Sequence, residues 1–502
     1  MGFGGMTAGA VRPSRLPPEA AAVRLARRAA LLALALLAAW VVLDGLVARI
    51  GLPLAFSYVE GFNVNDASRL AHGDALYGDP SGPPFVVSVY TPLYTSLVAL
   101  LIAQGLPGLL AARLVSLLSA TLLAGVIGFA RWRRTGVVAP IAACLFLLAP
   151  LQRSWLLVAR PDYTAALLSV LGILAVARGA AGGVGLLWAA PLLAAAILTK
   201  QSYVAAALAA TLFLIARSPR RGLGFAAALI ALLGGAIAAL LWASNGWFLF
   251  HTVTANRDPF SWGSAWTLAE RFLASHAPEL LLLSPALAAL APARRLSIFG
   301  LYAVIAAAVS LSSGKLGSDS NYFIEPLAAG ALLAANEFPI PWLLARGRPG
   351  RAACAALSAA SVVLGTVRFV EVRQMRRALS TEVTVFDRMC RDLAARPGPA
   401  ISDDAVLLRC AGKEVIFQPF VMTQLAEAGR WDQRPFLQEL ADGRIPTVIA
   451  QIRPESLFRS RYTKEMRGSL RTHYRAADSY QMTVDLAVFD LTVLETQRAP
   501  AR

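Results

Sequence analysis

Eleven apolar runs, separated by polar segments, constrain the fold of this chain more than any other feature. They extend from Ala29 to Ile50, Leu109 to Ala130, Val137 to Leu151, Tyr163 to Ala177, Val184 to Leu198, Val204 to Ala216, Leu223 to Trp242, Leu280 to Ala291, Leu296 to Leu311, Phe323 to Ala335 and Ala352 to Val367. About 20 apolar residues cross a bilayer as a helix, and several runs are shorter, so their boundaries are soft. A mean hydropathy of +0.58 is also far above that of a soluble chain. The sequence therefore predicts a polytopic α-helical membrane protein with about eleven spans.

The positions of the arginines explain the formal net charge of +17. The first 370 residues hold 27 Lys and Arg against 13 Asp and Glu, and the remainder holds 20 against 17. The excess falls on alternate loops, which contain Arg12, Arg15, Arg24, Arg27 and Arg28; Arg131, Arg133 and Arg134; Arg178; Arg217, Arg220 and Arg221; Arg294 and Arg295; Arg346, Arg348 and Arg351. This positive-inside pattern predicts a cytoplasmic N-terminus. It leaves no basic, aromatic-interleaved surface for a nucleic-acid partner.

One further apolar segment, Pro92 to Ala103, is long enough for a short span. Counting it as a span would place the arginines of residues 131–134 outside. We therefore expect it to be a helix that lies at the outer interface, within a first outer loop from residue 51 to residue 107. A true span, with the count shifted by one, is the alternative.

The two ends of the chain differ from the membrane region. We expect residues 1–28 to form a cytoplasmic disordered leader, residues 29–369 the transmembrane domain, and residues 370–502 an α/β domain. In the last of these, 381–395 resembles a helix, 400–408 and 447–452 resemble strands, and 482–493 alternates as strands do. The odd number of spans predicts that this domain lies outside. Cys390 and Cys410 both fall in it, where a disulfide can form; two free thiols are the alternative.

Charged and polar side chains gather in segments that this topology sends to the outer face. Glu60 and Asp66 follow the first span. Later segments contribute Arg160, Asp162, Lys200, Arg257, Lys315, Asp319, Asn321 and Tyr322. Snorkelling would scatter Lys and Arg over both interfaces without acids and amides, so the set favours a functional site. Helix capping by Asp162, and turn formation by Asp319 and Asn321, are the alternatives.

Several short motifs occur in an order typical of a known enzyme class. Glu-Gly at 60–61 is followed by Gly-Asp-Ala-Leu-Tyr at 73–77, Tyr-Thr-Pro-Leu-Tyr at 90–94, Arg-Leu-Val-Ser at 113–116, Arg-Pro-Asp at 160–162, Leu-Thr-Lys-Gln at 198–201 and Asn-Tyr-Phe at 321–323. Over roughly the first 340 residues, this order resembles the GT-C membrane glycosyltransferases. Within that class it is most similar to the bacterial relatives of protein O-mannosyltransferases and aminoarabinose transferases.

The resemblance implies a polyprenyl-phosphate-sugar donor and a glycan, lipid or protein acceptor. It also implies a multi-pass protein of the bacterial inner (plasma) membrane, with the C-terminal domain periplasmic or extracellular. A carboxylate must take the proton of the acceptor hydroxyl, and the family usually has an acidic pair or an Asp in the first loop for this role. Here Glu60 is followed by Gly61, so the role of general base is carried to Glu60, with Asp66 as the fallback.

The leaving lipid phosphate requires cations nearby, and the candidates are Arg160, Lys200, Arg257 and Lys315. No metal site is assigned among the sequence motifs, and a divalent cation bound by first-loop carboxylates stays open. A lipid-linked glycan or lipid transporter (flippase) is the alternative function, because ionisable groups also line transport paths. A ligase or polymerase of lipid-linked glycans would share the architecture, and a non-enzymatic scaffold would not need convergent acids and cations.

Overall fold

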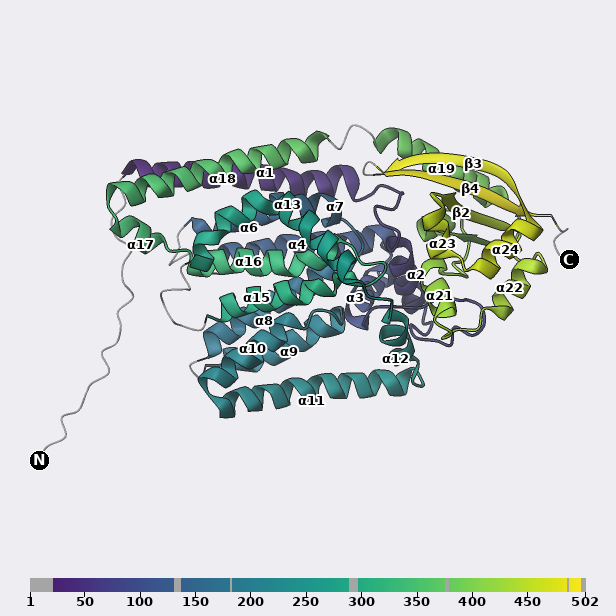
Figure 1. Cartoon of the computed structure of the whole chain (residues 1–502), viewed down its shortest axis with the longest axis horizontal. Helices are drawn as coiled ribbons and strands as arrows, with labels where there is room; N and C mark the ends of the chain where they lie inside the picture. The colour runs from purple at the N-terminus through teal and green to yellow at the C-terminus, as the bar shows by residue number, and fades with distance from the viewer. Residues whose placement is uncertain are drawn as a thin grey trace, which may run out of the picture.

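The structure is a computed structural model that describes residues 21–130, 137–180, 183–288, 297–374, 379–484 and 487–497. The molecule is elongated, with a bundle of helices that continues at one end into the C-terminal α/β part (Figure 1). The predicted leader up to residue 20 lies outside the described residues. So do the arginines at 131–134 and at 294–295, and the end of the eighth apolar run.

The apolar runs fall on helices of the bundle. Within the described residues, five helices are long and apolar enough to cross a membrane: α1 (Ala21–Asp44, continued by a π-helical turn to Arg49), α4 (Gly108–Phe129), α8 (Asp162–Gly179), α11 (Pro219–Ala243) and α18 (Arg348–Gln374). Shorter or more polar helices pack among them: α6 (Val138–Leu148), α7 (Pro150–Trp155), α9 (Gly185–Thr199), α10 (Ala205–Arg217), α13 (Trp262–Ala288), α15 (Ile298–Ser310), α16 (Ile324–Glu337) and α17 (Ile340–Ala345). The chain is thus a multi-pass membrane protein, and the number of spans stays a prediction.

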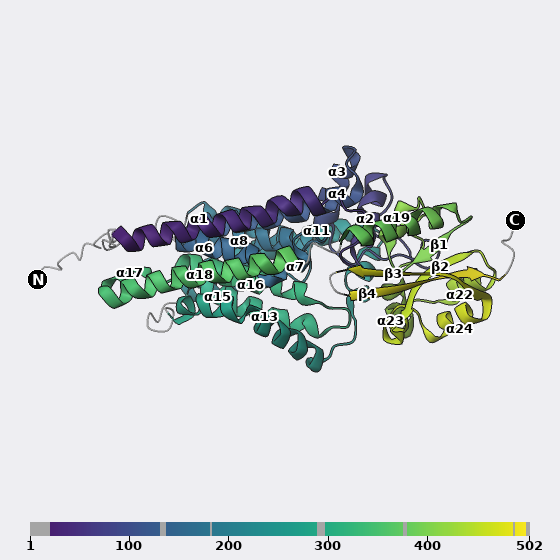
Figure 2. The same ribbon diagram turned by 90° about the horizontal axis from the view of Figure 1, so that it is seen from above.

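The first loop contains two helices, α2 (Glu60–Ala71) and α3 (Pro92–Ala103). Twelve helical residues extend about 18 Å, which is shorter than the roughly 30 Å of bilayer hydrocarbon. Helix α3 packs against α2, α4 and α9 at the end of the bundle that carries the C-terminal part (Figure 2). The location of this helix at the outer interface stays a prediction.

The C-terminal part contains a four-stranded sheet in the order β1-β2-β4-β3. Its strands are β1 (Ala400–Ser402), β2 (Thr447–Arg453), β3 (Tyr474–Val484) and β4 (Ala487–Thr496), and only β1 and β2 pair in parallel. The helices are α19 (Leu379–Ala395), α20 (Ala405–Cys410), α21 (Pro419–Glu427), α22 (Arg434–Ala441), α23 (Glu455–Arg461) and α24 (Lys464–His473).

The prediction of one strand over 400–408 was wrong in its second half. The strand ends at Ser402, and α20 begins at Ala405 because the Asp404 side chain caps it, accepting a hydrogen bond from the Val406 amide at 2.8 Å. The predicted strand pattern over 482–493 falls on the end of β3 and most of β4, which pair as a hairpin.

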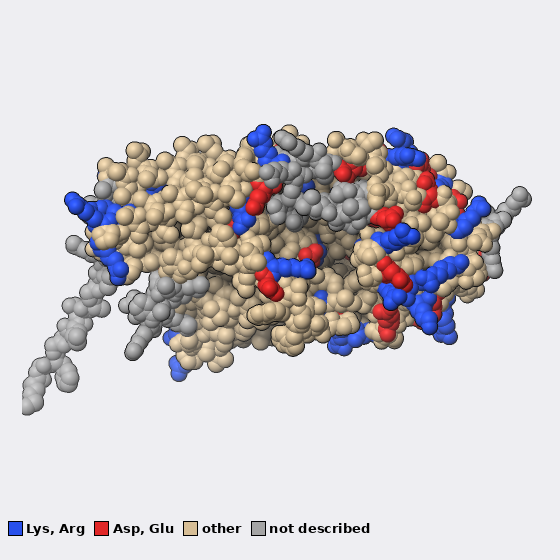
Figure 3. Space-filling view, turned by 45° about the horizontal axis from the view of Figure 1, so that its top comes forward, with Lys and Arg blue, Asp and Glu red and all other residues tan. Residues whose placement is uncertain are grey.

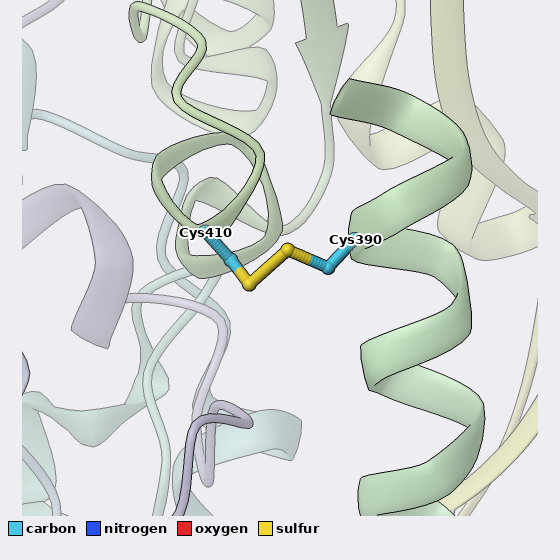
Figure 4. The surroundings of a disulfide bond; sticks show 2 residues. All are labelled: Cys390 and Cys410. Carbon is cyan, nitrogen blue, oxygen red and sulfur yellow. A yellow bond between two sulfur atoms is a disulfide. The ribbon is translucent and has the colours of Figure 1, made fainter. Parts of the chain in front are cut away.

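A disulfide joins Cys390 in α19 to Cys410 at the end of α20, with their Cα atoms 5.8 Å apart (Figure 4). The sequence left this pairing open. Cys144 and Cys354 are free and buried. The bond ties the short helix α20 to the longer α19, and this matters because α20 lies against the first loop.

The C-terminal part shares its core with the first loop. Phe85 and Phe417 form an isolated parallel bridge, and the Trp431 indole donates to the Pro80 carbonyl at 2.9 Å. The guanidinium of Arg461 lies 4.6 Å over the ring of Tyr58. Two apolar clusters contain buried residues from both regions. The boundary predicted at residue 369 stays a prediction, and the two regions on either side of it pack as one body around the first loop.

Charged side chains separate along the long axis. The described arginines of the predicted cytoplasmic loops lie where α8 and α10 end and where α1, α11 and α18 begin, which is the end away from the sheet (Figure 1). Figure 3 shows Lys and Arg at that end, then a long surface with few charges, then mixed charges toward and over the C-terminal part. The bundle therefore presents an apolar belt between two charged ends.

Candidate active site

Helix α2 begins at Glu60, whose carboxylate is fully buried. Its Oε1 accepts from Arg113 Nε at 3.2 Å and from the Ala159 amide at 2.8 Å. Its Oε2 accepts from Arg113 Nη2 at 3.1 Å and from the Phe56 amide at 2.6 Å. With two donors on each oxygen, Glu60 fixes the first loop to α4 and to the segment before α8.

Arg113 is itself fully buried and uses its remaining donors on the same loop. Nη1 donates to the Leu52 carbonyl and Nη2 to the Leu54 carbonyl, each at 2.7 Å, and the guanidinium lies 4.2 Å over the ring of Phe56. A buried ion pair with every donor and acceptor engaged is strongly destabilised when one partner is removed. This pair therefore holds the first loop in one conformation.

The close packing around position 61 explains why Gly61, and not a second acid, follows Glu60 in this chain. A Cβ at Gly61 would collide with backbone atoms of Ala405 and Val406, because α20 of the C-terminal part packs directly on α2. Arg409 of α20 adds a hydrogen bond to the Ser68 hydroxyl of α2 at 2.9 Å. Any larger residue at position 61 would push the C-terminal part off the first loop.

A second group of buried charges lies at the same end of the bundle, around Asp162 at the start of α8. Asp162 Oδ1 accepts from Lys200 Nζ at 2.6 Å and from the Asn321 side-chain amide at 2.9 Å. Arg160 Nε lies 3.4 Å from Asp162 Oδ2, and Arg160 Nη2 donates to the Tyr90 hydroxyl at 2.7 Å. Three sequence segments thus bring two cations, one carboxylate and one amide together, and the first loop adds the Tyr90 hydroxyl.

Aromatic rings surround the ammonium of Lys200, with the centroids of Tyr322 at 5.1 Å, Tyr203 at 5.6 Å and Tyr90 at 5.9 Å. Such rings stabilise a cation away from water. Several buried polar atoms here have no hydrogen-bond partner among the described residues: Asp162 Oδ2, Asn321 Oδ1, Gln201 Oε1 and the Tyr203 hydroxyl. Buried polar groups in native proteins are almost always paired, so this concentration is typical of a site that receives a polar ligand.

Asp66 lies two turns along α2 from Glu60 and is also buried. Burial raises its pKa to about 7, against the opposing effects of a hydrogen bond from Ser88 and the charge of Arg69. The Ser88 amide donates to His251 Nδ1 at 2.9 Å, and Ser88 is two residues before Tyr90, the partner of Arg160. Asp66 therefore lies in the same loop as Tyr90, whose hydroxyl accepts a hydrogen bond from Arg160.

The other candidates lie outside this group. Arg257 is exposed beside Arg430, whose Nη1 donates to the Arg257 carbonyl at 3.0 Å. Lys315 is near Asp258; burial lowers the pKa of Lys315 and raises that of Asp258, and their mutual attraction opposes both shifts. Asp319 is exposed and accepts from the Ser320 amide at the start of a 3₁₀ turn, as expected of a turn residue. The structure thus groups Arg160, Asp162, Lys200, Asn321 and Tyr322. The other three candidates, Arg257, Lys315 and Asp319, do not belong to this group.

Comparisons with known proteins agree with this architecture. No family model and no curated protein matches the sequence. Among solved structures, the chain is similar to ArnT from Cupriavidus metallidurans in the apo state, with 16% identity, a TM-score of 0.52 and coverage of 90% of this chain and 98% of ArnT. ArnT bound to undecaprenyl phosphate gives 15% identity, a TM-score of 0.52 and coverage of 96% and 100%.

A second similar protein is the archaeal oligosaccharyltransferase AglB from Archaeoglobus fulgidus, in complex with an inhibitory peptide and a dolichol-phosphate. It gives 13% identity and a TM-score of 0.53, over 92% of this chain and 73% of AglB. Both proteins are GT-C glycosyltransferases. The chain has the GT-C fold. Because the match covers at least 90% of this chain, the GT-C likeness extends beyond the 340 residues that carry the sequence motifs.

Two side chains that contact the candidate residues were not among the candidates predicted from the sequence. Arg113 was noticed only as part of a motif, although a charged residue inside an apolar run is the signal that marks a functional or structural ion pair. Tyr90 was named only as the first residue of the motif at 90–94, and its hydroxyl accepts a hydrogen bond from Arg160. Both pairings join residues far apart in the sequence, so no local pattern predicts them.

A divalent cation held by protein side chains alone requires several carboxylate, imidazole or thiolate ligands close together. Among the described residues, no group of three His, Cys, Asp or Glu side chains is close enough to hold a metal ion. Asp162 faces two cations rather than other carboxylates. No metal site is therefore assigned among the described residues.

Proposed function

We propose that this protein is a glycosyltransferase that moves a sugar from a polyprenyl-phosphate donor to an acceptor hydroxyl. The observation that carries the proposal is the buried group of Arg160, Asp162, Lys200 and Asn321, at the charged end of a bundle with the GT-C fold. A similar structure was solved with undecaprenyl phosphate bound, and another with a dolichol-phosphate. Both ligands are polyprenyl phosphates.

In this proposal, Lys200 and Arg160 receive the phosphate of the donor. Asp162 holds both cations in place before the donor arrives, and the phosphate oxygens then share or replace its contacts. As the glycosidic bond breaks, negative charge grows on the phosphate, and two fixed cations in a site shielded from water stabilise it. Asn321 and the tyrosines provide additional donors at the same place.

The general base is proposed to be a first-loop carboxylate, and Asp66 fits the role better than Glu60. Glu60 has two donors on each oxygen and would have to break its contacts with Arg113 before it could take a proton. A pKa of about 7 gives Asp66 the basicity that a general base needs near neutral pH. This reverses the preference drawn from the sequence.

The location proposed for the reaction is the outer face of a bacterial inner membrane. The described arginines at the opposite end fit the cytoplasmic side, and the disulfide of the C-terminal part fits an oxidising compartment. The acceptor is a glycan, lipid or protein hydroxyl, and the transferred sugar is a hexose or pentose. Membrane lipids surround the apolar belt.

The test is transfer of radiolabelled sugar from a panel of polyprenyl-phosphate donors by the purified protein in lipid nanodiscs. Lys200→Met is expected to lower turnover at least a hundredfold, because a fixed cation at the leaving group contributes about 3 kcal/mol or more. Lys464→Met removes an exposed lysine of α24 and is expected to keep full turnover. If no donor is used and sugar-lipid flux across liposomes is observed instead, the protein is a transporter and the proposal fails.

A further inference from the structure

The C-terminal part contains a groove of about 410 Å³ that the proposed transfer reaction does not use. Phe458, Leu470 and Tyr474 line it and are themselves buried, while Arg453, Glu455 and Arg471 line it with exposed side chains. The volume falls in the range of sites for small molecules or short oligomers. No residue of the helical bundle lines the groove.

Basic residues are frequent in the segment that forms much of this groove, and two of them, Arg453 and Arg471, line it. Residues 453–475 hold seven Lys and Arg against two Asp and Glu, whereas the rest of 371–502 holds 13 against 15. Glu455, an acid in the rim, is already paired with Arg459 at 2.8 Å. The hydrogen bond and charge of Arg459, followed by the charges of Arg471 and Arg467, hold the pKa of Glu455 below its ordinary value. The rim therefore carries excess positive charge. The carboxylate of Glu455 stays ionised, and the charge of Arg459 balances it.

The buried apolar residues at the floor of the groove and the exposed charged residues at its rim together indicate the chemistry of the ligand. An apolar floor can contact the C–H groups of a sugar, and guanidinium groups bind carboxylates in paired hydrogen bonds. A nucleic acid would instead need a long basic path with exposed aromatic side chains for stacking. Here the aromatic side chains are buried beneath a short rim.

We propose that this groove binds an anionic oligosaccharide. It is a second binding site, separate from the membrane-embedded charges, and it would hold an acidic glycan near the enzyme before or after transfer. The choice of a glycan rests on the proposed function, whereas the binding itself needs neither donor nor turnover.

The test uses the full-length protein in zwitterionic phosphatidylcholine nanodiscs, without donor. Isothermal titration with octagalacturonate, an acidic octasaccharide, is expected to give saturable binding, and neutral maltooctaose is expected to bind at least tenfold more weakly. Arg453→Gln and Arg471→Gln are each expected to weaken octagalacturonate binding about tenfold, as for one charge-assisted hydrogen bond. Arg388→Gln changes an exposed arginine of α19, which lies on the other side of the sheet in Figure 2, and is expected to change nothing.

Three results would overturn the proposal. The first is no binding of octagalacturonate at millimolar concentration, and the second is equal binding of the acidic and neutral octasaccharides. The third is equal binding of a single-stranded oligonucleotide of the same charge, which would make the groove a general polyanion surface. Melting temperatures of the variants show whether the fold is kept, and a Phe458→Ala variant tests the floor independently of charge. Sugar transfer by the two arginine variants is measured in parallel, so failure of this proposal is distinguishable from failure of the proposed function.

Discussion

At the residue scale, the two first-loop carboxylates differ in their surroundings and therefore in their chemistry. Glu60 accepts four hydrogen bonds, two on each carboxylate oxygen, and these hold the first loop in place. Asp66 is buried with fewer compensating contacts, and its pKa is raised to about 7. We therefore propose that Glu60 holds the first loop and that Asp66 is the general base.

Replacing Glu60 by Gln is expected to destabilise the protein by about 3–5 kcal/mol, because Arg113 would be left as an uncompensated buried charge. The measurement is the thermal unfolding midpoint in detergent, followed by tryptophan fluorescence. The control is the Glu60→Gln, Arg113→Met double variant, which removes both charges and is expected to recover part of the loss. An unchanged midpoint with abolished turnover would instead assign the base to Glu60, as the sequence alone predicted.

The pH dependence of turnover is expected to report Asp66. A base acts only when unprotonated, so kcat/KM should rise with pH through an apparent pKa of about 7. Asp66→Asn is expected to remove this rise and to lower turnover by about 10²–10⁴-fold. Asp74→Asn, in the same loop but exposed, serves as the control. A wild-type profile that is flat between about pH 6 and 8 would exclude Asp66 as the base.

At the scale of elements, the short helix α20 connects the C-terminal part to the site. The disulfide holds α20 to α19, and α20 in turn packs on α2 at Gly61. Glu60, the neighbour of Gly61, fixes the backbone at Ala159, next to Arg160. The position of α20 is thus transmitted over a few residues to a cation of the proposed donor site.

Gly61→Ala is expected to destabilise this contact by about 1–3 kcal/mol, because the added methyl meets backbone atoms that cannot turn away. Thermal unfolding and limited proteolysis of the C-terminal part would both report it, and turnover would fall with them. Gly51→Ala is the matched control, since a Cβ there meets nothing within 4 Å. Equal stability of the two variants would show that α20 is free to shift.

The elements also show what the sequence could and could not predict. Apolar runs and arginine positions were enough for the helices and for the separation of charge, because both follow from local composition. The prediction of a strand over 400–408 was wrong after Ser402, because Asp404 caps a helix there although the apolar pattern is typical of a strand. The partners of Asp162, Glu60 and Tyr90 could not be predicted, since each pairing depends on helix packing between segments far apart in the chain.

At the scale of the whole molecule, two charged ends enclose an apolar belt, and this arrangement predicts an orientation. Single cysteines introduced at Arg348 and at Arg434 would be labelled with a membrane-impermeant thiol reagent in intact cells. Labelling of Arg434→Cys but not of Arg348→Cys is expected, because α18 begins at the arginine-rich end and α22 lies in the C-terminal part. The two free native cysteines are buried and provide the background. Labelling of Arg348→Cys from outside would invert the topology.

The shared core of the first loop and the C-terminal part can form only late in the synthesis of the chain. Hydrogen bonds such as that from Arg409 to Ser68 join residues 341 positions apart. At 5–20 residues per second, a ribosome needs roughly 20–70 s to pass from one partner to the other. During that interval α2 has no α20 to pack on. The contact between α2 and α20 is therefore completed only when nearly the whole chain has been made.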